Sequence, residues 1–138
     1  MKNPVGVHPF MIQTVRSFAE SDYMYAQGRT RPGSIISYAK GGQSYHNYGL
    51  ALDFVNLIGG KMVWPKRPEL DENWMIVVNI FKSYGFEAGI DWKGKKRDAP
   101  HFQKTFGLHW SELLALHNAG KIEGDYVKIN LNPSNIVS

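Results

Sequence analysis

Residues 44–53 decide how the rest of this chain is interpreted, and they read Ser44-Tyr45-His46-Asn47-Tyr48-Gly49-Leu50-Ala51-Leu52-Asp53. The residues just before them, Gly41–Ser44, are typical of a flexible loop, whereas Leu50–Val55 is typical of a strand that enters a core. Side chains alternate between the two faces of a strand, so Asp53 shares its face with small residues. Burial of an unpaired charge is costly, so this carboxylate needs a partner. His46 is the candidate neighbour, with both groups directed towards a cation.

The composition is that of a globular chain, and it limits the possible metal ligands. The 138 residues are 43% hydrophobic and 20% charged, which predicts one folded domain, residues 1–138, with a buried core. The chain contains no cysteine. This excludes a disulfide framework, a thiolate zinc site and a cysteine nucleophile, so any metal ligand must come from His, Asp or Glu.

The net charge of +4 and the pI of about 9.3 favour polyanionic partners: nucleic acid, anionic lipid or the acid-rich polymers of a bacterial wall. The chain shows no recognisable nucleic-acid motif and no apolar run that approaches a membrane span. Its first residues, Met1 to Pro4, do not begin a secretory signal. We therefore expect a monomer that is cytoplasmic when made, with no nucleic-acid partner and no stable membrane association.

The predicted elements indicate an α+β fold. Ser17 and Glu20 match a capping box, which begins a helix that ends near Gly28. The strongest helical pattern covers Asn73–Tyr84, where apolar residues recur every three or four positions. The other expected elements are a loose lead-in at 1–9, strands at Phe10–Val15, Ser34–Ala39, Leu50–Val55, Lys61–Trp64, Phe86–Trp92 and Tyr126–Ile129, a turn at Gly59-Gly60, a helix at Ser111–Asn118 and a frayed tail at 132–138.

Two of the five histidines have a carboxylate at a short spacing. His46 is followed by Asp53, and His101 is preceded by Asp98, with Pro100 stiffening the connection. Two imidazoles and one carboxylate form the ligand set of a catalytic zinc site, and the second carboxylate can then act as a general base. Asp53 suits the ligand because its strand fixes it. Asp98 suits the base because it lies on a loop beside a ligand.

Simpler structural roles stay open for the same residues. Asp53 could cap a neighbouring turn, and Asp98 could pair at the surface with Arg97 or Lys96. The other histidines need only surface or capping roles: His8, His109 and His117.

Arg16 and Trp92 are further candidates. Arg16 ends a predicted strand and precedes a helix, where its cation could stabilise an oxyanion that develops on a polarised carbonyl. A surface salt bridge is the alternative. Trp92 precedes the basic run Lys93–Arg97 and could line a cleft or pack in the core. The basic run could be a solvated loop or could hold an acidic substrate.

Two motifs carry a family resemblance: Ser44-x-His46-x2-Gly49-x-Ala51-x-Asp53 and Asp98-x-Pro100-His101-Phe102-Gln103. They resemble the zinc-dependent L-alanyl-D-glutamate peptidases, which cleave peptidoglycan as phage endolysins and bacterial wall hydrolases. These are related to the D-alanyl-D-alanine carboxypeptidases and dipeptidases of the vancomycin-resistance type. The resemblance runs from about Gln13 to Leu116. It implies a hedgehog-like fold, in which a small antiparallel sheet carries a zinc site and packs against about three helices.

The resemblance also implies roles for single residues. One zinc ion per chain would have the ligands His46, Asp53 and His101. Asp98 would be the catalytic base, and Arg16 would face the scissile carbonyl oxygen. Ser44 would support the metal site, and the expected substrate-binding residues are Ser44, Trp92 and Gln103. The D-alanyl-D-alanine branch usually has glutamate as its base, in a Glu-x-x-His arrangement, so Asp98 favours the L-alanyl-D-glutamate branch.

The expected function is therefore zinc-dependent hydrolysis of the peptidoglycan stem peptide, with lysis of the cell wall. The alternatives are D-alanyl-D-alanine cleavage, a wall-binding module without turnover, and a basic nucleic-acid binder. Two features depart from the family: a short segment before Arg16, and a more basic Lys93–Arg97 loop, which is compatible with the free carboxylates of the stem peptide. Lack of a signal peptide and of a separate wall-binding domain fits a small phage endolysin that reaches the wall through a phage-made membrane pore.

Overall fold

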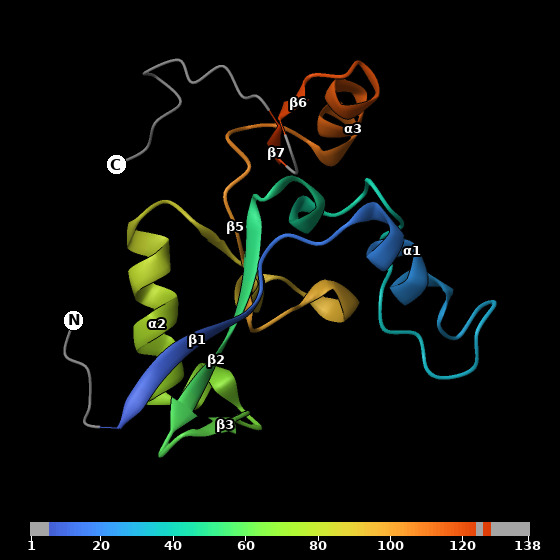
Figure 1. The fold of residues 1–138 in the computed structure, drawn as a ribbon. Helices are drawn as coiled ribbons and strands as arrows, with labels where there is room; N and C mark the ends of the chain where they lie inside the picture. Colours follow the sequence, from blue (N-terminus) through green and yellow to red (C-terminus); the bar gives the residue numbers. More distant parts are fainter. Residues whose placement is uncertain (1–5, 124–125, 128–138) are drawn as a thin grey trace. The chain divides into compact units, whose positions relative to one another are not determined.

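The computed structural model describes residues 6–123 and 126–127 (Figure 1). The chain divides into two compact units. Of the described residues, the first unit contains 6–13 and Leu52–Lys104, and the second contains Thr14–Ala51, 105–123 and 126–127. Compact units of this kind also occur within one domain, so the single domain expected for residues 1–138 stays a prediction.

The first unit contains a five-stranded sheet. Its strands are β1 (Val7–Gln13), β2 (Ala51–Ile58), β3 (Lys61–Val63), β4 (Glu87–Ala88) and β5 (His101–Gln103). They lie in the order β1-β2-β5-β4, with β3 also paired to β2. The β1–β2, β2–β3 and β4–β5 pairs are antiparallel. This order places β5, which carries His101, beside β2, which carries Asp53.

The core of the first unit lies between this sheet and α2 (Glu72–Ser83), which runs alongside it in Figure 1. The side chain of Asp71 begins the helix by accepting a hydrogen bond from the backbone N–H of Trp74 at 2.9 Å. The buried residues of this core are Phe54, Val55, Trp74, Val77, Val78, Ala88, Ile90 and Phe102. Each large apolar side chain buried in this way contributes about 1.5–3 kcal/mol, so the core fixes the strands that carry Asp53 and His101.

The second unit has its own small core. Its elements are α1 (Phe18–Ala26), the 3₁₀ helix η1 (Tyr45–Tyr48), α3 (Trp110–Asn118) and a hairpin of β6 (Ile122–Glu123) and β7 (Tyr126–Val127). Buried Tyr48 and Leu113 form its centre, and the partly buried residues packed against them are Phe18, Tyr45, Leu50, Leu108 and Leu116. Ser17 caps α1 by accepting a hydrogen bond from the backbone N–H of Glu20 at 3.0 Å, as the sequence predicts.

Short 3₁₀ helices complete the first unit: η2 (Pro68–Leu70), η3 (Gly89–Asp91) and η4 (Gly94–Lys96).

Of the predicted elements, the three helices are confirmed within one residue at their starts, and the turn between β2 and β3 is confirmed at Gly59-Gly60. Strand β1 begins at Val7, three residues before the predicted start, so the lead-in predicted for residues 1–9 is wrong from Val7 onward. Strand β7 confirms the start of the last predicted strand, whose residues 128 and 129 lie outside the described residues.

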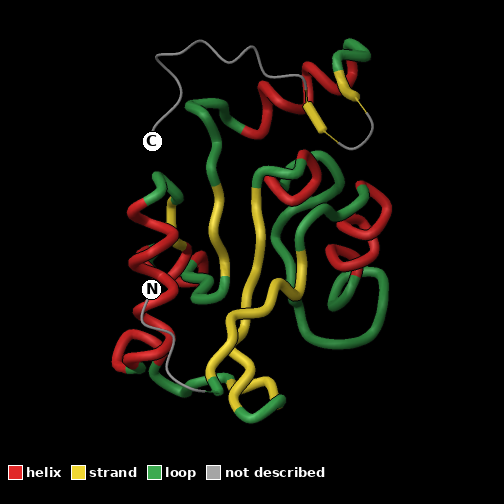
Figure 2. Tube along the Cα trace, turned by 60° about the vertical axis from the view of Figure 1, so that its left-hand side comes forward, coloured by secondary structure: helices red, strands yellow, loops and turns green. Residues whose placement is uncertain are grey.

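Two predicted strands are wrong. Ser34–Ala39 is a loop, seen in the green segment that follows α1 in Figure 2. Its carbonyls bond to side chains instead of a neighbouring strand, since Gln27 donates to the Ser34 carbonyl at 3.0 Å and Arg29 to the Ser37 carbonyl at 3.0 Å. The strand predicted at Phe86–Trp92 is reduced to β4, because the chain turns into η3 at Gly89.

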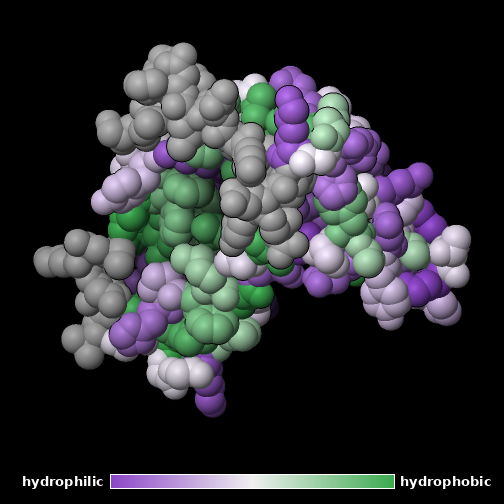
Figure 3. Space-filling model, turned by 45° about the horizontal axis from the view of Figure 1, so that its top comes forward, coloured by the Kyte–Doolittle hydropathy of each residue, from purple (hydrophilic) through white to green (hydrophobic). Residues whose placement is uncertain are grey.

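Large apolar side chains also remain on the surface. Phe10, Met11 and Ile12 of β1 are 47%, 41% and 38% exposed. Figure 3, which colours one face of the molecule by hydropathy, shows hydrophobic areas next to hydrophilic ones. No helix in the described part of the chain is both long and apolar enough to cross a bilayer.

Candidate metal and catalytic site

His46 lies on η1, and contacts with nearby residues orient its ring. The hydroxyl of Ser44 caps η1 and accepts a hydrogen bond from the backbone N–H of His46 at 3.3 Å. The imidazole is buried, and its Nδ1 lies 2.8 Å from the Thr14 carbonyl oxygen. A carbonyl only accepts, so Nδ1 carries the proton in this contact. The lone pair of the neutral ring then lies on Nε2, which can bind a metal.

Asn47 holds this segment together, although it is not among the predicted site residues. Its side-chain oxygen accepts from the backbone N–H of Gly42 at 3.0 Å and of Ser44 at 3.2 Å. Its nitrogen donates to the Arg16 carbonyl and to the Ser21 hydroxyl, both at 2.9 Å. The capping box formed by Ser44 and Asn47 is a local signal that could have identified it.

Replacing Asn47 with alanine is expected to lower the free energy of unfolding by about 2–4 kcal/mol, because buried donors and acceptors lose their partners. Denaturant unfolding followed by tryptophan fluorescence would measure the change. Asn79→Ala, on the exposed face of α2, is the matched control and should change stability by less than about 0.5 kcal/mol. Equal stability of the two variants would contradict the role assigned to Asn47.

In the first unit, Asp53 and His101 are direct partners. The Asp53 Oδ1 atom lies 3.2 Å from His101 Nδ1, and both side chains are largely buried. Asp98 Oδ2 lies 3.9 Å from the same nitrogen, on a side chain that is about half exposed. Burial lowers the pKa of His101, but hydrogen bonds with Asp53 and Gln103 and the charges of both carboxylates outweigh it. The pKa of His101 therefore lies above its usual value, which means that these surroundings favour the protonated form of its own ring.

A close backbone contact fixes the turn that carries Asp98. The backbone N–H of Asp98 donates to the Gly89 carbonyl at 3.0 Å, and the Asp98 carbonyl accepts from the backbone N–H of His101 at 3.1 Å. A Cβ atom at position 89 would collide with the Asp98 carbonyl oxygen, so glycine is needed for this approach. Arg97, a partner suggested for Asp98, pairs instead with Glu69 at 2.9 Å.

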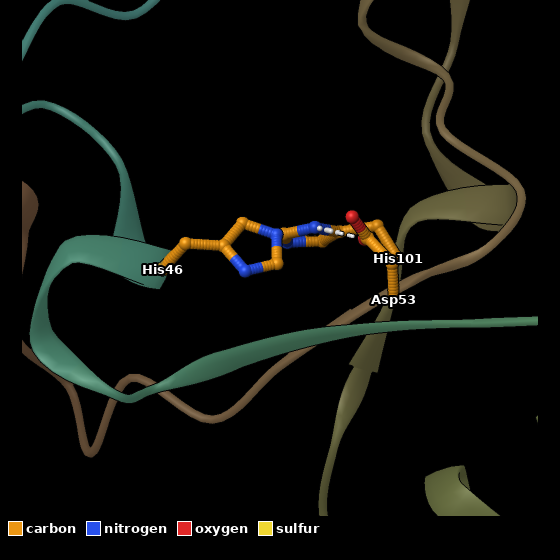
Figure 4. Close-up of side chains that lie close together, drawn as sticks. All are labelled: His46, Asp53 and His101. Carbon is orange, nitrogen blue, oxygen red and sulfur yellow. Dashed lines mark hydrogen bonds and ion pairs between the residues drawn. The ribbon is translucent and has the colours of Figure 1, made fainter. Parts of the chain in front are cut away.

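His46, Asp53 and His101 each offer one ligand atom, and these atoms lie within 4.8 Å of one another (Figure 4). Two nitrogens and one carboxylate oxygen suit a zinc ion, which commonly takes His and Asp ligands. The 3.2 Å between Asp53 Oδ1 and His101 Nδ1 is close to the spacing of about 3.3 Å expected for two ligands of a tetrahedral zinc ion. The donor set therefore fits a metal site.

Comparisons with known proteins show what this chain is similar to. Residues 37–104 match a family model described as D-alanyl-D-alanine carboxypeptidase. The chain is 44% identical over 103 residues to the peptidoglycan L-alanyl-D-glutamate endopeptidase CwlK of Bacillus subtilis (strain 168). Its fold is similar to the crystal structure of the L-Ala D-Glu endopeptidase ChiX of Serratia marcescens, with a TM-score of 0.51 and 25% identity. These matches confirm the resemblance to peptidoglycan L-alanyl-D-glutamate peptidases that the sequence motifs indicate.

The likeness to these peptidases covers part of each chain. The match to CwlK covers 71% of this chain and 61% of the relative, so the chain spans about three-fifths of that protein's length. The match to ChiX covers 72% of this chain and 68% of the other. It confirms the predicted fold class, a small antiparallel sheet with three helices.

The region matched by the peptidase family model includes four of the predicted site residues: His46, Asp53, Asp98 and His101. Arg16 lies outside it, between β1 and α1. The backbone N–H of Arg16 donates to the His46 carbonyl at 3.0 Å. Its Nε atom is buried and has no hydrogen-bond partner among the described residues.

The remaining candidates have partners of their own in the structure. Trp92 Nε1 donates to Glu87 Oε2 at 2.8 Å, and its ring centroid lies 5.2 Å from that of His101. Gln103 lies between His101 and Glu87. Glu87 was not a predicted site residue, because only the pairing of β4 with β5 brings it opposite Gln103. The substrate-binding roles of Ser44, Trp92 and Gln103 stay predictions.

Proposed function

We propose that this chain is a zinc-dependent peptidase that hydrolyses the L-alanyl-D-glutamate bond of the peptidoglycan stem peptide. The observation that carries the proposal is the His46, Asp53 and His101 donor set, with a second carboxylate, Asp98, 3.9 Å from His101. The names of the two relatives, both L-alanyl-D-glutamate endopeptidases, support the choice of bond.

His46, Asp53 and His101 would hold one zinc ion per chain, through the nitrogen and oxygen atoms described above. A zinc ion bound there would polarise the scissile carbonyl and lower the pKa of water beside it. The buried hydrogen bond from His46 Nδ1 to the Thr14 carbonyl orients one ligand, and the strand pairing of β2 and β5 orients the other two.

Asp98 is assigned the role of general base. Its carboxylate accepts a proton from the water that attacks the carbonyl carbon, and it passes that proton to the leaving nitrogen as the C–N bond breaks. A half-exposed side chain held by a turn suits this role, because it can reach both water and substrate. The Arg16 guanidinium is assigned to the carbonyl oxygen, where negative charge develops. Its buried Nε atom, without a partner among the described residues, supports that role.

The stem peptide carries free carboxylates, and the basic run Lys93–Arg97 would face an acidic substrate favourably. This run is exposed, and it includes the 3₁₀ helix η4. We also propose that the protein acts on the cell wall, like an endolysin that is released through a phage-made pore. We further propose that it is a monomer without stable membrane association.

One specific observation favours a second candidate. The family model that matches residues 37–104 is described as D-alanyl-D-alanine carboxypeptidase, so cleavage of the terminal D-alanyl-D-alanine bond is the alternative activity. The base at position 98 is aspartate, whereas that branch usually has glutamate. This difference supports the L-alanyl-D-glutamate bond. A wall-binding module without turnover would not need the carboxylate at position 98.

Mass spectrometry of the fragments released from purified peptidoglycan tests the proposal. We expect fragments with new D-glutamyl amino termini, and no release when a chelator is present. Release of free D-alanine would support the second candidate. Binding to the wall without any fragment would contradict both activities and leave the wall-binding module.

A further inference from the structure

A chain of polar side chains leads from the surface of β4 to the buried ring of His101. Gln103 Oε1 lies 2.8 Å from His101 Nε2, and Gln103 Nε2 donates to Glu87 Oε2 at 3.1 Å. Trp92 Nε1 donates to the same Glu87 oxygen at 2.8 Å. His101 and Gln103 are both 7% exposed, so their hydrogen bond is shielded from water.

Strand geometry explains why these groups meet. His101 and Gln103 are two residues apart on β5, so their side chains point to the same face of the sheet. Glu87 on β4 is the direct cross-strand partner of Gln103. Trp92 follows η3, the turn that leads away from β4. The contacts therefore follow from backbone pairing and do not depend on a mobile loop.

The donor and acceptor properties of these groups set the direction of every hydrogen bond. A carboxylate only accepts, so Glu87 requires the amide nitrogen of Gln103 to face it. The amide oxygen of Gln103 then faces His101, and it also only accepts. His101 must therefore carry a proton on Nε2, so Nδ1, which donates to Asp53 while it is protonated, is the nitrogen that can present a lone pair to a metal ion. Nδ1 is the nitrogen that lies 3.2 Å from Asp53.

We propose that Glu87 and Gln103 are positioning residues that select Nδ1 of His101 as the metal ligand. Gln103 contacts the ligand, and Glu87 keeps the Gln103 amide from turning over. Trp92 holds the Glu87 carboxylate from the other side. The inference rests on the proposed metal site, and it gives Gln103 and Trp92 a role that needs no contact with substrate.

Two variants can first remove and then restore the fixed direction of the hydrogen bonds from His101 through Gln103 to Glu87. In Glu87→Gln, the new amide can donate to Gln103 as well as accept, so the Gln103 amide is free to turn and present its nitrogen to His101. In the double variant Glu87→Gln with Gln103→Glu, the carboxylate moves to position 103. It accepts from His101 Nε2 and from the new amide at position 87, whose oxygen accepts from Trp92. Every donor again meets an acceptor.

Zinc affinity, measured by chelator competition on metal-free protein, is the first readout. Gln103→Leu should weaken zinc binding by about 10–100-fold, which is typical for loss of a group that orients a metal ligand. Glu87→Gln should weaken it in the same direction, and the double variant should restore most of the affinity. Glu72→Gln, exposed on α2, is the matched control and should bind zinc like the unchanged chain.

The second readout is the protonated nitrogen of His101, from 15N-histidine NMR of the zinc-loaded protein. We expect the proton on Nε2 in the unchanged chain and in the double variant. A proton on Nδ1, or unchanged zinc affinity in both Gln103→Leu and Glu87→Gln, would overturn the inference. If Gln103→Leu does not fold, Glu87→Gln and the double variant still decide it. Failure of the unchanged chain to bind zinc would instead refute the proposed function, and the inference with it.

Discussion

Replacing His101 with alanine is expected to weaken zinc binding by more than about 100-fold, beyond the loss expected for a group that only orients a ligand. It should also reduce hydrolysis of peptidoglycan to background. His101 contributes a buried nitrogen 3.2 Å from Asp53, and alanine leaves nothing to replace it. His46→Ala and Asp53→Ala should behave in the same way, because each removes one of the three ligands. Metal analysis after dialysis gives the zinc content, and release of amino groups from purified wall gives the activity.

His8→Ala is the matched control for these ligand variants. His8 lies on β1 with its side chain exposed, so its loss should leave both zinc content and hydrolysis unchanged. If a ligand variant keeps one zinc per chain, that residue is not a ligand. If all three variants keep it, the metal site is placed wrongly.

Replacing Asp98 with asparagine is expected to reduce hydrolysis by about 10²–10⁴-fold while zinc remains bound. Asparagine has nearly the shape of aspartate but cannot accept the proton of the attacking water. The turn at position 98 should persist, because its hydrogen bonds to Gly89 and His101 use backbone atoms alone. Kinetics on purified wall and metal analysis of the same sample check both parts of the prediction.

Asp91→Asn provides the control for the loss of one negative charge in the same region. Asp91 is exposed and pairs with Lys82 at 2.7 Å, so this change should have little effect on hydrolysis. Full activity of Asp98→Asn would show that another group takes the proton. Loss of zinc from Asp98→Asn would make Asp98 a ligand and not a base.

The parts of the fold that the sequence predicts well are those with local signals. The period of Trp74, Val77 and Val78 predicts α2, because these side chains must share one face of a helix to be buried. Ser17 predicts the start of α1 for an equally local reason, since its hydroxyl bonds to a backbone group only three residues away.

Parts that depend on distant contacts were missed. The Ser34–Ala39 segment has strand-like residues, but Gln27 and Arg29 side chains take its carbonyls, and no local pattern indicates that competition. The register that places Glu87 opposite Gln103 is likewise invisible in the sequence. The same holds for the approach of Gly89 to the Asp98 carbonyl, which ends β4 early.

The sequence predicts the candidate site in part. Spacing within the chain and the family resemblance select His46, Asp53, Asp98 and His101, and three of these offer clustered ligand atoms. Which nitrogen of each histidine carries a proton in these contacts follows only from the structure. The Thr14 carbonyl and Gln103 decide it, and they come from residues 32 positions before His46 and two positions after His101.

A zinc titration of metal-free protein, with bound zinc and peptidoglycan hydrolysis measured on the same samples, tests most directly whether the chain is a zinc-dependent peptidase. We expect hydrolysis to be absent without metal, to rise in proportion to bound zinc and to stop rising at one zinc per chain. Full hydrolysis by the metal-free protein would contradict this expectation, and so would a chain that binds one zinc and releases no amino groups from the wall.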